Sequence, residues 1–178
     1  MKAVFLDRDG VLNRAVIRDG KPYPPADVGE LEIVPDAAEA LAALKDSGFL
    51  LFVVTNQPDI ARGKQTWLML DAIHAEMAAG LPIDGFYVCP HDDPDGCGCR
   101  KPKPGLLQQA ASEHAISLAD SYMIGDRWRD VEAGRRAGCR TIWLDFGYRE
   151  RGPDISPDAT LDSLTEAAAW ILAQPRKL

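Results

Sequence analysis

The sequence has no long apolar run. Met1 and Lys2 lead into only four apolar residues before Asp7, far fewer than the apolar region of a secretory signal peptide contains. No other run approaches the roughly 20 apolar residues that cross a bilayer. We therefore expect a cytoplasmic protein without membrane association. In that compartment the four cysteines would stay reduced, and clustered cysteines would favour metal binding over disulfides.

The sequence also has no excess of positive charge. Its 178 residues include 20 basic and 27 acidic side chains, which gives a formal net charge of −7. A long nucleic-acid backbone needs an extended basic surface, so the composition argues against nucleic acid as a partner. An acidic chain can still bind a small phosphorylated molecule through a local cluster of cations.

Short apolar segments alternate with amphipathic ones along nearly the whole chain. The pattern predicts strands at 2–6, 49–54, 86–89, 121–124 and 140–144, and helices at 36–47, 65–79, 104–114, 130–137 and 161–172. The segments 8–30 and 145–158 are predicted loops. This alternation predicts a doubly wound, Rossmann-like α/β fold with a parallel sheet of about five or six strands. No repeat or linker divides the sequence, so we expect one domain over residues 1–178.

Polar groups follow four of the predicted strands. Asp7 and Asp9 follow the first, Thr55 the second, Cys89 stands at the end of the third, and Asp126 follows the fourth. Ligands of such sheets bind outside the carboxyl ends of the strands, so these groups should meet at one edge. Carboxylates attack as nucleophiles and bind Mg²⁺ through oxygen, and phosphoryl transfer uses both properties.

A basic segment and a further aspartate accompany these groups. Arg100, Lys101 and Lys103 are three cations within four residues, and two prolines restrict their backbone. A lysine beside Asp7 would offset charge on the carboxylate and on a transferring phosphoryl group. Asp130 fits two interpretations: an acid favoured by the dipole of a helix's first turn, or a group that orients Asp126 or Lys101. Taken alone, Thr55 suits a turn cap and the basic segment suits a solvated loop.

Three cysteines and one histidine lie close together in the sequence: Cys89, His91, Cys97 and Cys99. This set suits a closed tetrahedral zinc site with no open position for catalysis. The polar residues between them cannot hold a loop by burying apolar area, so zinc would fix it and aim the cations that follow. The alternative is a loop with reduced cysteines. Cys139 lies outside the cluster and is predicted to be buried, and we assign no function to His74 and His114.

The order aspartate pair, threonine, lysine, aspartate resembles the haloacid dehalogenase-like phosphatases over nearly the whole chain. The matching segments are 5–10, 54–57, 60–63, 99–102 and 124–126. Within that superfamily the pattern, with its Cys-x-His and Cys-x-Cys loop, is similar to the bacterial D-glycero-D-manno-heptose 1,7-bisphosphate 7-phosphatases. It is also similar to the histidinol-phosphate phosphatases. Pro58 departs from the small residue expected after Thr-Asn-Gln.

The resemblance implies a magnesium-dependent phosphomonoesterase that works through an aspartyl-phosphate. Asp7 would be the nucleophile, and Asp9 would protonate the leaving group and then activate water. Thr55 and Lys101 would hold the phosphoryl group. Magnesium would bind the Asp7 and Asp126 side chains and the backbone carbonyl of Asp9. The matched positions that contact substrate in relatives are Asn56, Arg100 and Arg127.

No segment between the motifs is long enough for a large cap domain, so we expect a capless site shaped by the loops 8–30, 56–64 and 89–101. We expect a monomer that removes the 7-phosphate of a heptose bisphosphate. Histidinol phosphate or another small metabolite is the alternative substrate. The negative charge disfavours a nucleic-acid end phosphatase. A non-catalytic zinc-stabilised binding module would have little reason to combine Asp7, Asp9, Lys101 and Asp126.

Overall fold

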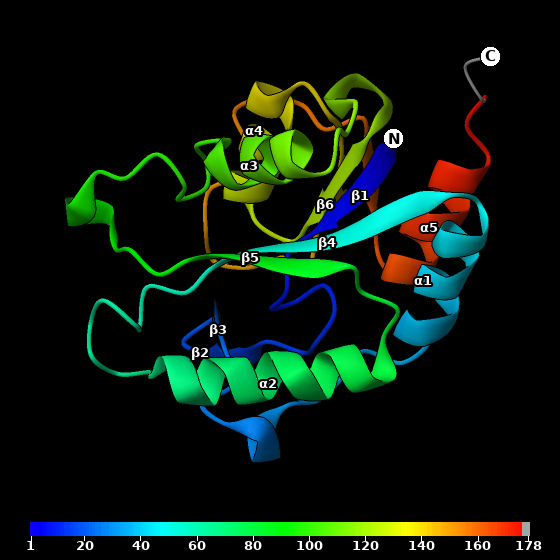
Figure 1. Ribbon diagram of the computed structural model, residues 1–178. Helices are drawn as coiled ribbons and strands as arrows, with labels where there is room; N and C mark the ends of the chain where they lie inside the picture. The colour runs from blue at the N-terminus through cyan, green and yellow to red at the C-terminus, as the bar shows by residue number, and fades with distance from the viewer. Residues whose placement is uncertain (176–178) are drawn as a thin grey trace.

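Six parallel strands form one twisted sheet in the computed structural model, which describes residues 1–175 (Figure 1). Across the sheet the strands follow the order β5 (Gly85–Cys89), β4 (Phe49–Asn56), β1 (Lys2–Leu6), β6 (Tyr122–Gly125), β7 (Arg140–Leu144) and β8 (Ala159–Leu161). This is the doubly wound order, and it reverses direction between β1 and β6. The predicted α/β fold class is confirmed. The reversal places the ends of β1 and β6 at the topological switch point.

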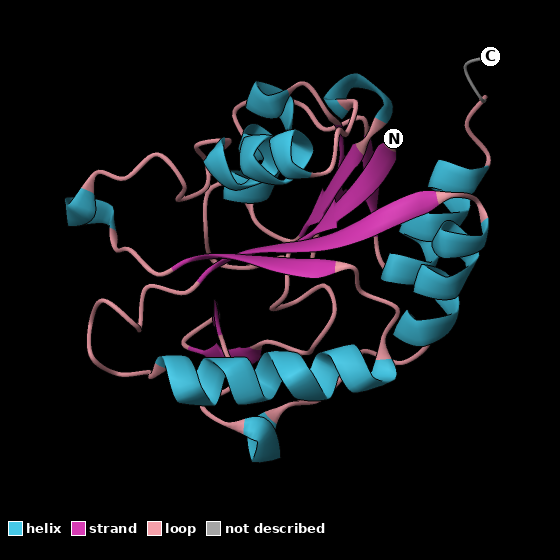
Figure 2. Ribbon diagram, in the orientation of Figure 1, coloured by secondary structure: helices cyan, strands magenta, loops and turns pink. Residues whose placement is uncertain are grey.

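Helices cover both faces of the sheet (Figures 1 and 2). Their bounds are α1 Ala37–Asp46, α2 Trp67–Gly80, α3 Gly105–Glu113, α4 Trp128–Ala137 and α5 Leu164–Leu172. Val4 and Leu6 of β1 pack with α1, α2 and α5, whereas Ala3 and Phe5 pack with α3 and α4. This alternation is the two-residue period of a strand that is buried on both sides. Within residues 1–175, no helix combines the length and apolarity needed to span a membrane.

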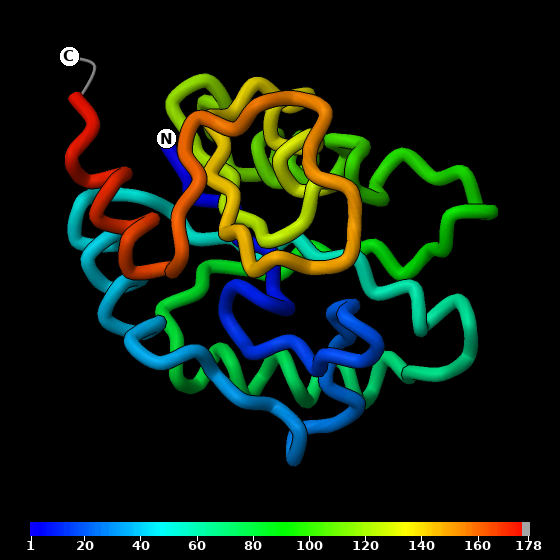
Figure 3. Tube along the Cα trace, turned by 180° about the vertical axis from the view of Figure 1, so that it is seen from behind, coloured from blue at the N-terminus to red at the C-terminus, as the bar shows by residue number. Residues whose placement is uncertain are grey.

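The predicted loop 8–30 contains a β-hairpin. Its strands, β2 (Val16–Arg18) and β3 (Lys21–Tyr23), pair antiparallel and lie on the same side of the sheet as α2 (Figures 1 and 3). Asp19 and Gly20 connect them with φ angles of 52° and 76°. Two central residues with positive φ make a type I′ turn, which Asp-Gly favours. A short 3-10 helix at Val28–Glu30 completes the segment. The prediction overlooked this turn signal because the strands have only three residues each.

The last predicted helix begins three residues too early. Ala159–Leu161 forms β8, which pairs with β7 at the edge of the sheet. The helix α5 begins at Leu164, and the Ser163 side chain caps it by accepting a hydrogen bond from Glu166 N at 3.1 Å. A three-residue edge strand has no measurable period of its own, so its pairing partner decides its conformation.

Candidate active site

Three buried aspartates meet at the switch point. Asp7 directly follows β1, and its N–H donates to Ile124 O of β6 at 2.9 Å. Asp126 directly follows β6, and Asp130 lies one turn into α4. Each contributes a carboxylate oxygen, and these oxygens lie within 4.8 Å of one another. The structure thus brings together Asp7 and Asp126, as predicted, and adds Asp130 to the same cluster.

Lys101 supplies the positive charge in contact with this cluster. Its Nζ lies 2.8 Å from Asp7 Oδ1, 2.6 Å from Asp130 Oδ1 and 2.7 Å from Val54 O. These contacts use all three donors of the ammonium group. The residue is only 2% exposed. Burial opposes its charge, but the carboxylates of Asp130 and Asp7 outweigh burial and raise the pKa of Lys101.

Asp130 makes contacts that agree with both interpretations of its position. Its Oδ2 accepts a hydrogen bond from Arg127 N at 3.0 Å, which caps the first turn of α4. Its Oδ1 contacts the Lys101 ammonium. The two interpretations are compatible because a carboxylate has two oxygens that can accept separately. Asp130 therefore anchors Lys101 to a helix terminus.

The aspartate cluster has the properties of a divalent cation site. Burial and then the charge of Asp130 raise the pKa of Asp7 to about 6, although Lys101 opposes the rise. Burial and then the charge of Asp7 raise the pKa of Asp126 well above its ordinary value. The Tyr148 hydroxyl interacts with the Asp126 carboxylate and opposes this rise in its pKa. Buried carboxylates clustered in this way suit Mg²⁺, which prefers oxygen ligands.

Gly10 closes one side of the cluster. Its φ is +89°, and a Cβ at this position would lie 1.9 Å from Asp126 Oδ2. Only glycine permits both this backbone conformation and this close approach.

The Asp9 carboxylate is held by other side chains, outside the aspartate cluster. Its Oδ1 accepts from Arg8 Nε at 3.1 Å, Arg8 Nη2 at 2.9 Å and Asn13 Nδ2 at 3.0 Å. Its Oδ2 accepts from Arg8 Nη2 at 3.0 Å and Gln57 Nε2 at 2.9 Å. Gln57 also donates to the hydroxyl of the buried Thr55 at 2.9 Å. Sequence reasoning did not single out Arg8, Asn13 or Gln57; their one signal is their place within or next to the predicted motifs.

A cavity of about 290 Å³ opens over Asp7, Asp9, Thr55 and Lys101. Residues of the β2–β3 hairpin form part of its wall. All three predicted substrate residues also line it, together with three further cations; the six are Asn56, Arg100, Arg127, Lys21, Arg62 and Arg129. A polar cavity with several cations can accommodate an anionic molecule larger than phosphate.

The three predicted substrate residues already have partners within the protein. Asn56 Oδ1 accepts from Lys101 N at 3.0 Å, and Asn56 Nδ2 donates to Lys101 O at 3.1 Å. Arg100 Nε donates to Asp93 at 2.7 Å, and Arg127 Nε donates to Glu150 at 2.9 Å. Asn56 therefore clamps the backbone of Lys101, whereas the two arginines are ion-paired at the cavity wall.

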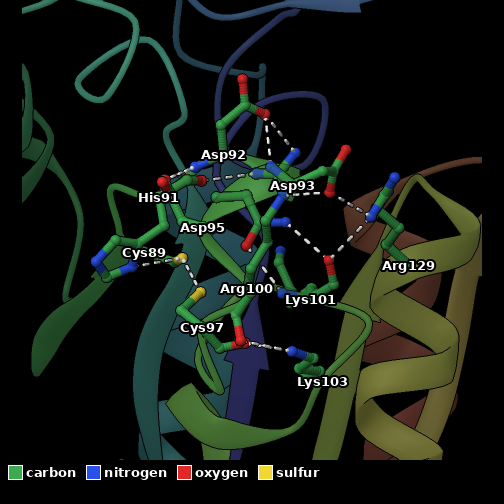
Figure 4. A network of polar contacts seen from close by, with 12 residues as sticks. Cys89, His91, Asp92, Asp93, Asp95, Cys97, Arg100, Lys101, Lys103 and Arg129 are labelled. Carbon is green, nitrogen blue, oxygen red and sulfur yellow. Dashed lines mark hydrogen bonds and ion pairs between the residues drawn. The ribbon is translucent and has the colours of Figure 1, made fainter.

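The four cysteine and histidine side chains each offer a ligand atom, and these atoms lie within 4.8 Å of one another. Figure 4 shows Cys89, His91 and Cys97 of this set. Cys89 Sγ lies 3.6 Å from Cys97 Sγ and 3.2 Å from Cys99 Sγ, and Cys97 and Cys99 are 3.4 Å apart. His91 Nδ1 lies 3.7 Å from Cys89 Sγ and 3.4 Å from Cys99 Sγ. Tetrahedral zinc with ordinary bond lengths would place sulfurs about 3.8 Å apart and nitrogen about 3.6 Å from sulfur. The four residues fit zinc after small adjustments.

Polar contacts link this cluster to the segment that carries Lys101 (Figure 4). Lys103 Nζ donates to the carbonyls of Gly96 at 3.1 Å and Cys97 at 2.5 Å. Arg100 Nη1 donates to His91 O at 3.2 Å. The side chains on either side of Lys101 in the sequence therefore bind the backbone of the cysteine loop.

Comparison with known proteins agrees with the fold. Residues 98–167 match the family model for HAD-hydrolase-like proteins. The D-glycero-beta-D-manno-heptose-1,7-bisphosphate 7-phosphatase of Pseudomonas aeruginosa is 35% identical, and the alignment covers 95% of this chain and 97% of that protein. The enzyme of the same name from Escherichia coli K12 is 36% identical, with 96% and 87% covered.

A solved structure extends the comparison to three dimensions. The D,D-heptose 1,7-bisphosphate phosphatase of B. bronchiseptica, crystallised with magnesium and phosphate, superposes with a TM-score of 0.78. It is 30% identical and matches 97% of this chain and 98% of its own. The fold and the strand-end site thus define a haloacid dehalogenase-like hydrolase. Within that class, the chain belongs to the family of D-glycero-β-D-manno-heptose-1,7-bisphosphate 7-phosphatases.

Proposed function

We propose that the protein is a magnesium-dependent phosphatase that removes the 7-phosphate of D-glycero-β-D-manno-heptose 1,7-bisphosphate. The observation that carries the proposal is the buried Asp7 carboxylate beside Lys101 and Asp126 at the switch point. The choice of substrate is supported by the names of relatives that are 35% and 36% identical over nearly the whole chain.

In the first half of the reaction, an Asp7 carboxylate oxygen attacks phosphorus. A new O–P bond forms while the bond from phosphorus to the sugar oxygen breaks, which leaves an aspartyl-phosphate. Asp9 donates a proton to the departing sugar oxygen. The Lys101 ammonium and the Thr55 hydroxyl bind the phosphoryl oxygens, where negative charge accumulates.

In the second half, Asp9 takes a proton from a water molecule. That water attacks phosphorus, the bond to Asp7 breaks, and inorganic phosphate and free Asp7 result. Mg²⁺, held by Asp7, Asp126 and the backbone carbonyl of Asp9, would supply positive charge that offsets the repulsion between carboxylate and phosphate. The magnesium and phosphate in the B. bronchiseptica structure support this assignment.

Arg100 and Arg127 are proposed to bind the rest of the substrate. Both line the cavity, and both are paired with an acid that an incoming phosphate can replace. A second phosphate suits the cations of this wall better than the amine of histidinol phosphate does. Asn56 is proposed to act through Lys101, because its amide binds the lysine backbone on both sides.

The Cys89, His91, Cys97 and Cys99 set is proposed to bind structural zinc. The distances among these side chains support a four-coordinate site without an open position. Zinc would hold the loop that carries Arg100 and Lys101 over the cavity. The cysteines must be reduced to bind it, which supports a cytoplasmic location.

A substrate comparison tests the proposed function. We expect the α and β heptose bisphosphates, with Mg²⁺, to be hydrolysed with higher kcat/KM than histidinol phosphate or a nucleotide panel. Asp7→Asn should abolish turnover while the exposed-site control Asp71→Asn keeps it. A folded Asp7→Asn protein with wild-type turnover would refute the nucleophile, and a preference for histidinol phosphate would refute the substrate.

A further inference from the structure

Arg8 is a fully buried cation next to the proposed acid–base residue. It is 0% exposed, and its guanidinium contacts both carboxylate oxygens of Asp9. Its remaining nitrogen, Nη1, lies 3.2 Å from Nε2 of His74, a residue 66 positions away in the chain. Within residues 1–175, Asp9 and His74 are the hydrogen-bonding partners of this side chain. A buried guanidinium is stable only when its donors are matched in this way.

His74 is also buried and packs against the sheet. It lies on α2, is 7% exposed, and stacks on Phe86 of β5 with ring centroids 4.3 Å apart and an angle of 14° between the rings. Burial and then the positive charge of Arg8 lower the pKa of His74 to about 4, although Asp9 opposes this. The ring is therefore neutral at pH 7. Because arginine has only donors, Nε2 must accept, and the hydrogen resides on Nδ1.

We propose that His74 is a positioning residue for the phosphatase reaction. It fixes the Arg8 guanidinium, which in turn holds the Asp9 carboxylate where it can exchange protons with the leaving group and with water. The inference rests on the proposed function, since it assigns Asp9 the acid–base step. The proposal assigns a role to His74, for which the sequence suggested no function.

The geometry explains why a distant residue is needed. Asn13 and Gln57 each contact one oxygen of Asp9, whereas Arg8 reaches both. Arg8 and Asp9 are neighbours in the chain, so the two side chains could rotate together while the hydrogen bonds between them stay intact. Gln57, which follows β4, ties one oxygen of Asp9 to the sheet, and the hydrogen bond from Arg8 to His74 adds a second tie, to α2. Proton transfer is sensitive to such orientation.

Three variants test the inference. His74→Leu removes the acceptor and keeps an apolar side chain, whereas His74→Gln can place an amide oxygen near the position of Nε2. His114→Leu is the control, because His114 also packs against a phenylalanine of the sheet, Phe52, with centroids 4.6 Å apart and the rings tilted by 34°, but contacts Tyr87 instead of Arg8.

The readout is kcat/KM for phenyl phosphate and p-nitrophenyl phosphate. The ratio kcat/KM reports the steps up to departure of the leaving group. Phenyl phosphate releases the strongly basic phenolate, which needs a proton from an acid, whereas p-nitrophenyl phosphate releases the weakly basic p-nitrophenolate, which hardly does. We expect His74→Leu to lower kcat/KM about tenfold for phenyl phosphate and less than about twofold for p-nitrophenyl phosphate. His74→Gln should recover most of the loss, and His114→Leu should match the wild type.

Equal losses with both substrates, or no loss, would overturn the inference. Aryl phosphates make this test independent of the proposed substrate, because their hydrolysis can be measured even if the enzyme does not hydrolyse heptose bisphosphate. A crystal structure of His74→Leu tests the positioning role without measuring activity. Arg8 and Asp9 in unchanged positions would count against a positioning role, whereas a displaced guanidinium would support it.

Discussion

Replacing Lys101 by methionine would leave two carboxylates buried without their shared counter-charge. The lysine Nζ contacts Asp7 and Asp130 at 2.8 and 2.6 Å, and the residue is 2% exposed. Methionine has a similar length and no charge, so it removes the ion pairs without a large cavity. Removing one partner of a buried ion pair costs about 3–5 kcal/mol. For a chain of 178 residues, each kcal/mol lowers the melting midpoint by about 2–4 °C.

The loss of stability in Lys101→Met should depend on pH. In the wild type, folding raises the pKa of Asp7 from 3.8 to about 6. A carboxyl with a raised pKa favours the folded state at low pH, and this advantage is lost as pH rises through the folded-state pKa. Without Lys101 the pKa of Asp7 rises further. The stability deficit of the variant should therefore be small near pH 5 and grow toward pH 8.

A double variant separates stability from catalysis. Adding Asp130→Asn to Lys101→Met removes one of the stranded charges and should restore about 1–3 kcal/mol, within the range of coupling between contacting residues. Phosphatase activity should stay lost, because the phosphoryl group still lacks its cation. Urea unfolding in metal-free buffer at pH 5 and pH 8 measures the first effect, and single-turnover kinetics the second. An unchanged unfolding midpoint for Lys101→Met at pH 8, or an equal deficit at both pH values, would refute the reasoning.

Three further predictions concern the two proposed metal sites. Gly10→Ala should weaken Mg²⁺ binding and cost about 1–3 kcal/mol of stability, because its Cβ would lie 1.9 Å from Asp126 Oδ2 at a φ of +89°. Gly80→Ala, with open space around the new methyl group, is its control, and equal Mg²⁺ titrations of the two would contradict the prediction. Mg²⁺ affinity measured by calorimetry should fall as pH drops below about 6, where protons compete for Asp7; the same affinity at pH 5 and pH 8 would argue against Asp7 as a ligand. Purified protein should contain about one zinc per chain. Cys97→Ala should lose the zinc and most activity while far-ultraviolet circular dichroism stays unchanged, and full activity without zinc would show that the loop needs no metal.

The sequence alone was sufficient for the class of fold and for the main members of the site. Alternating apolar segments predict a parallel sheet, because strand and helix periods are local properties of the chain. The polar residues at the ends of those strands then have to share one edge. This is why the sequence groups Asp7, Thr55 and Asp126, whereas Lys101 joins them through the resemblance to haloacid dehalogenase-like phosphatases. Motif spacing likewise predicted the cysteine and histidine cluster, whose members lie within eleven residues.

Only the tertiary structure decided what surrounds these residues. The short strands β2, β3 and β8 depend on pairing partners, which a three-residue segment cannot specify by its own pattern. The second function of Asp130 and the clamp from Asn56 to Lys101 join residues that are 29 and 45 positions apart. The His74 contact with Arg8 spans 66 positions. The orientation of a buried side chain depends on the residues that pack against it, and in this protein those residues come from other strands and helices. The sequence therefore identifies the acids and cations of the site, but only the tertiary structure determines how they are oriented.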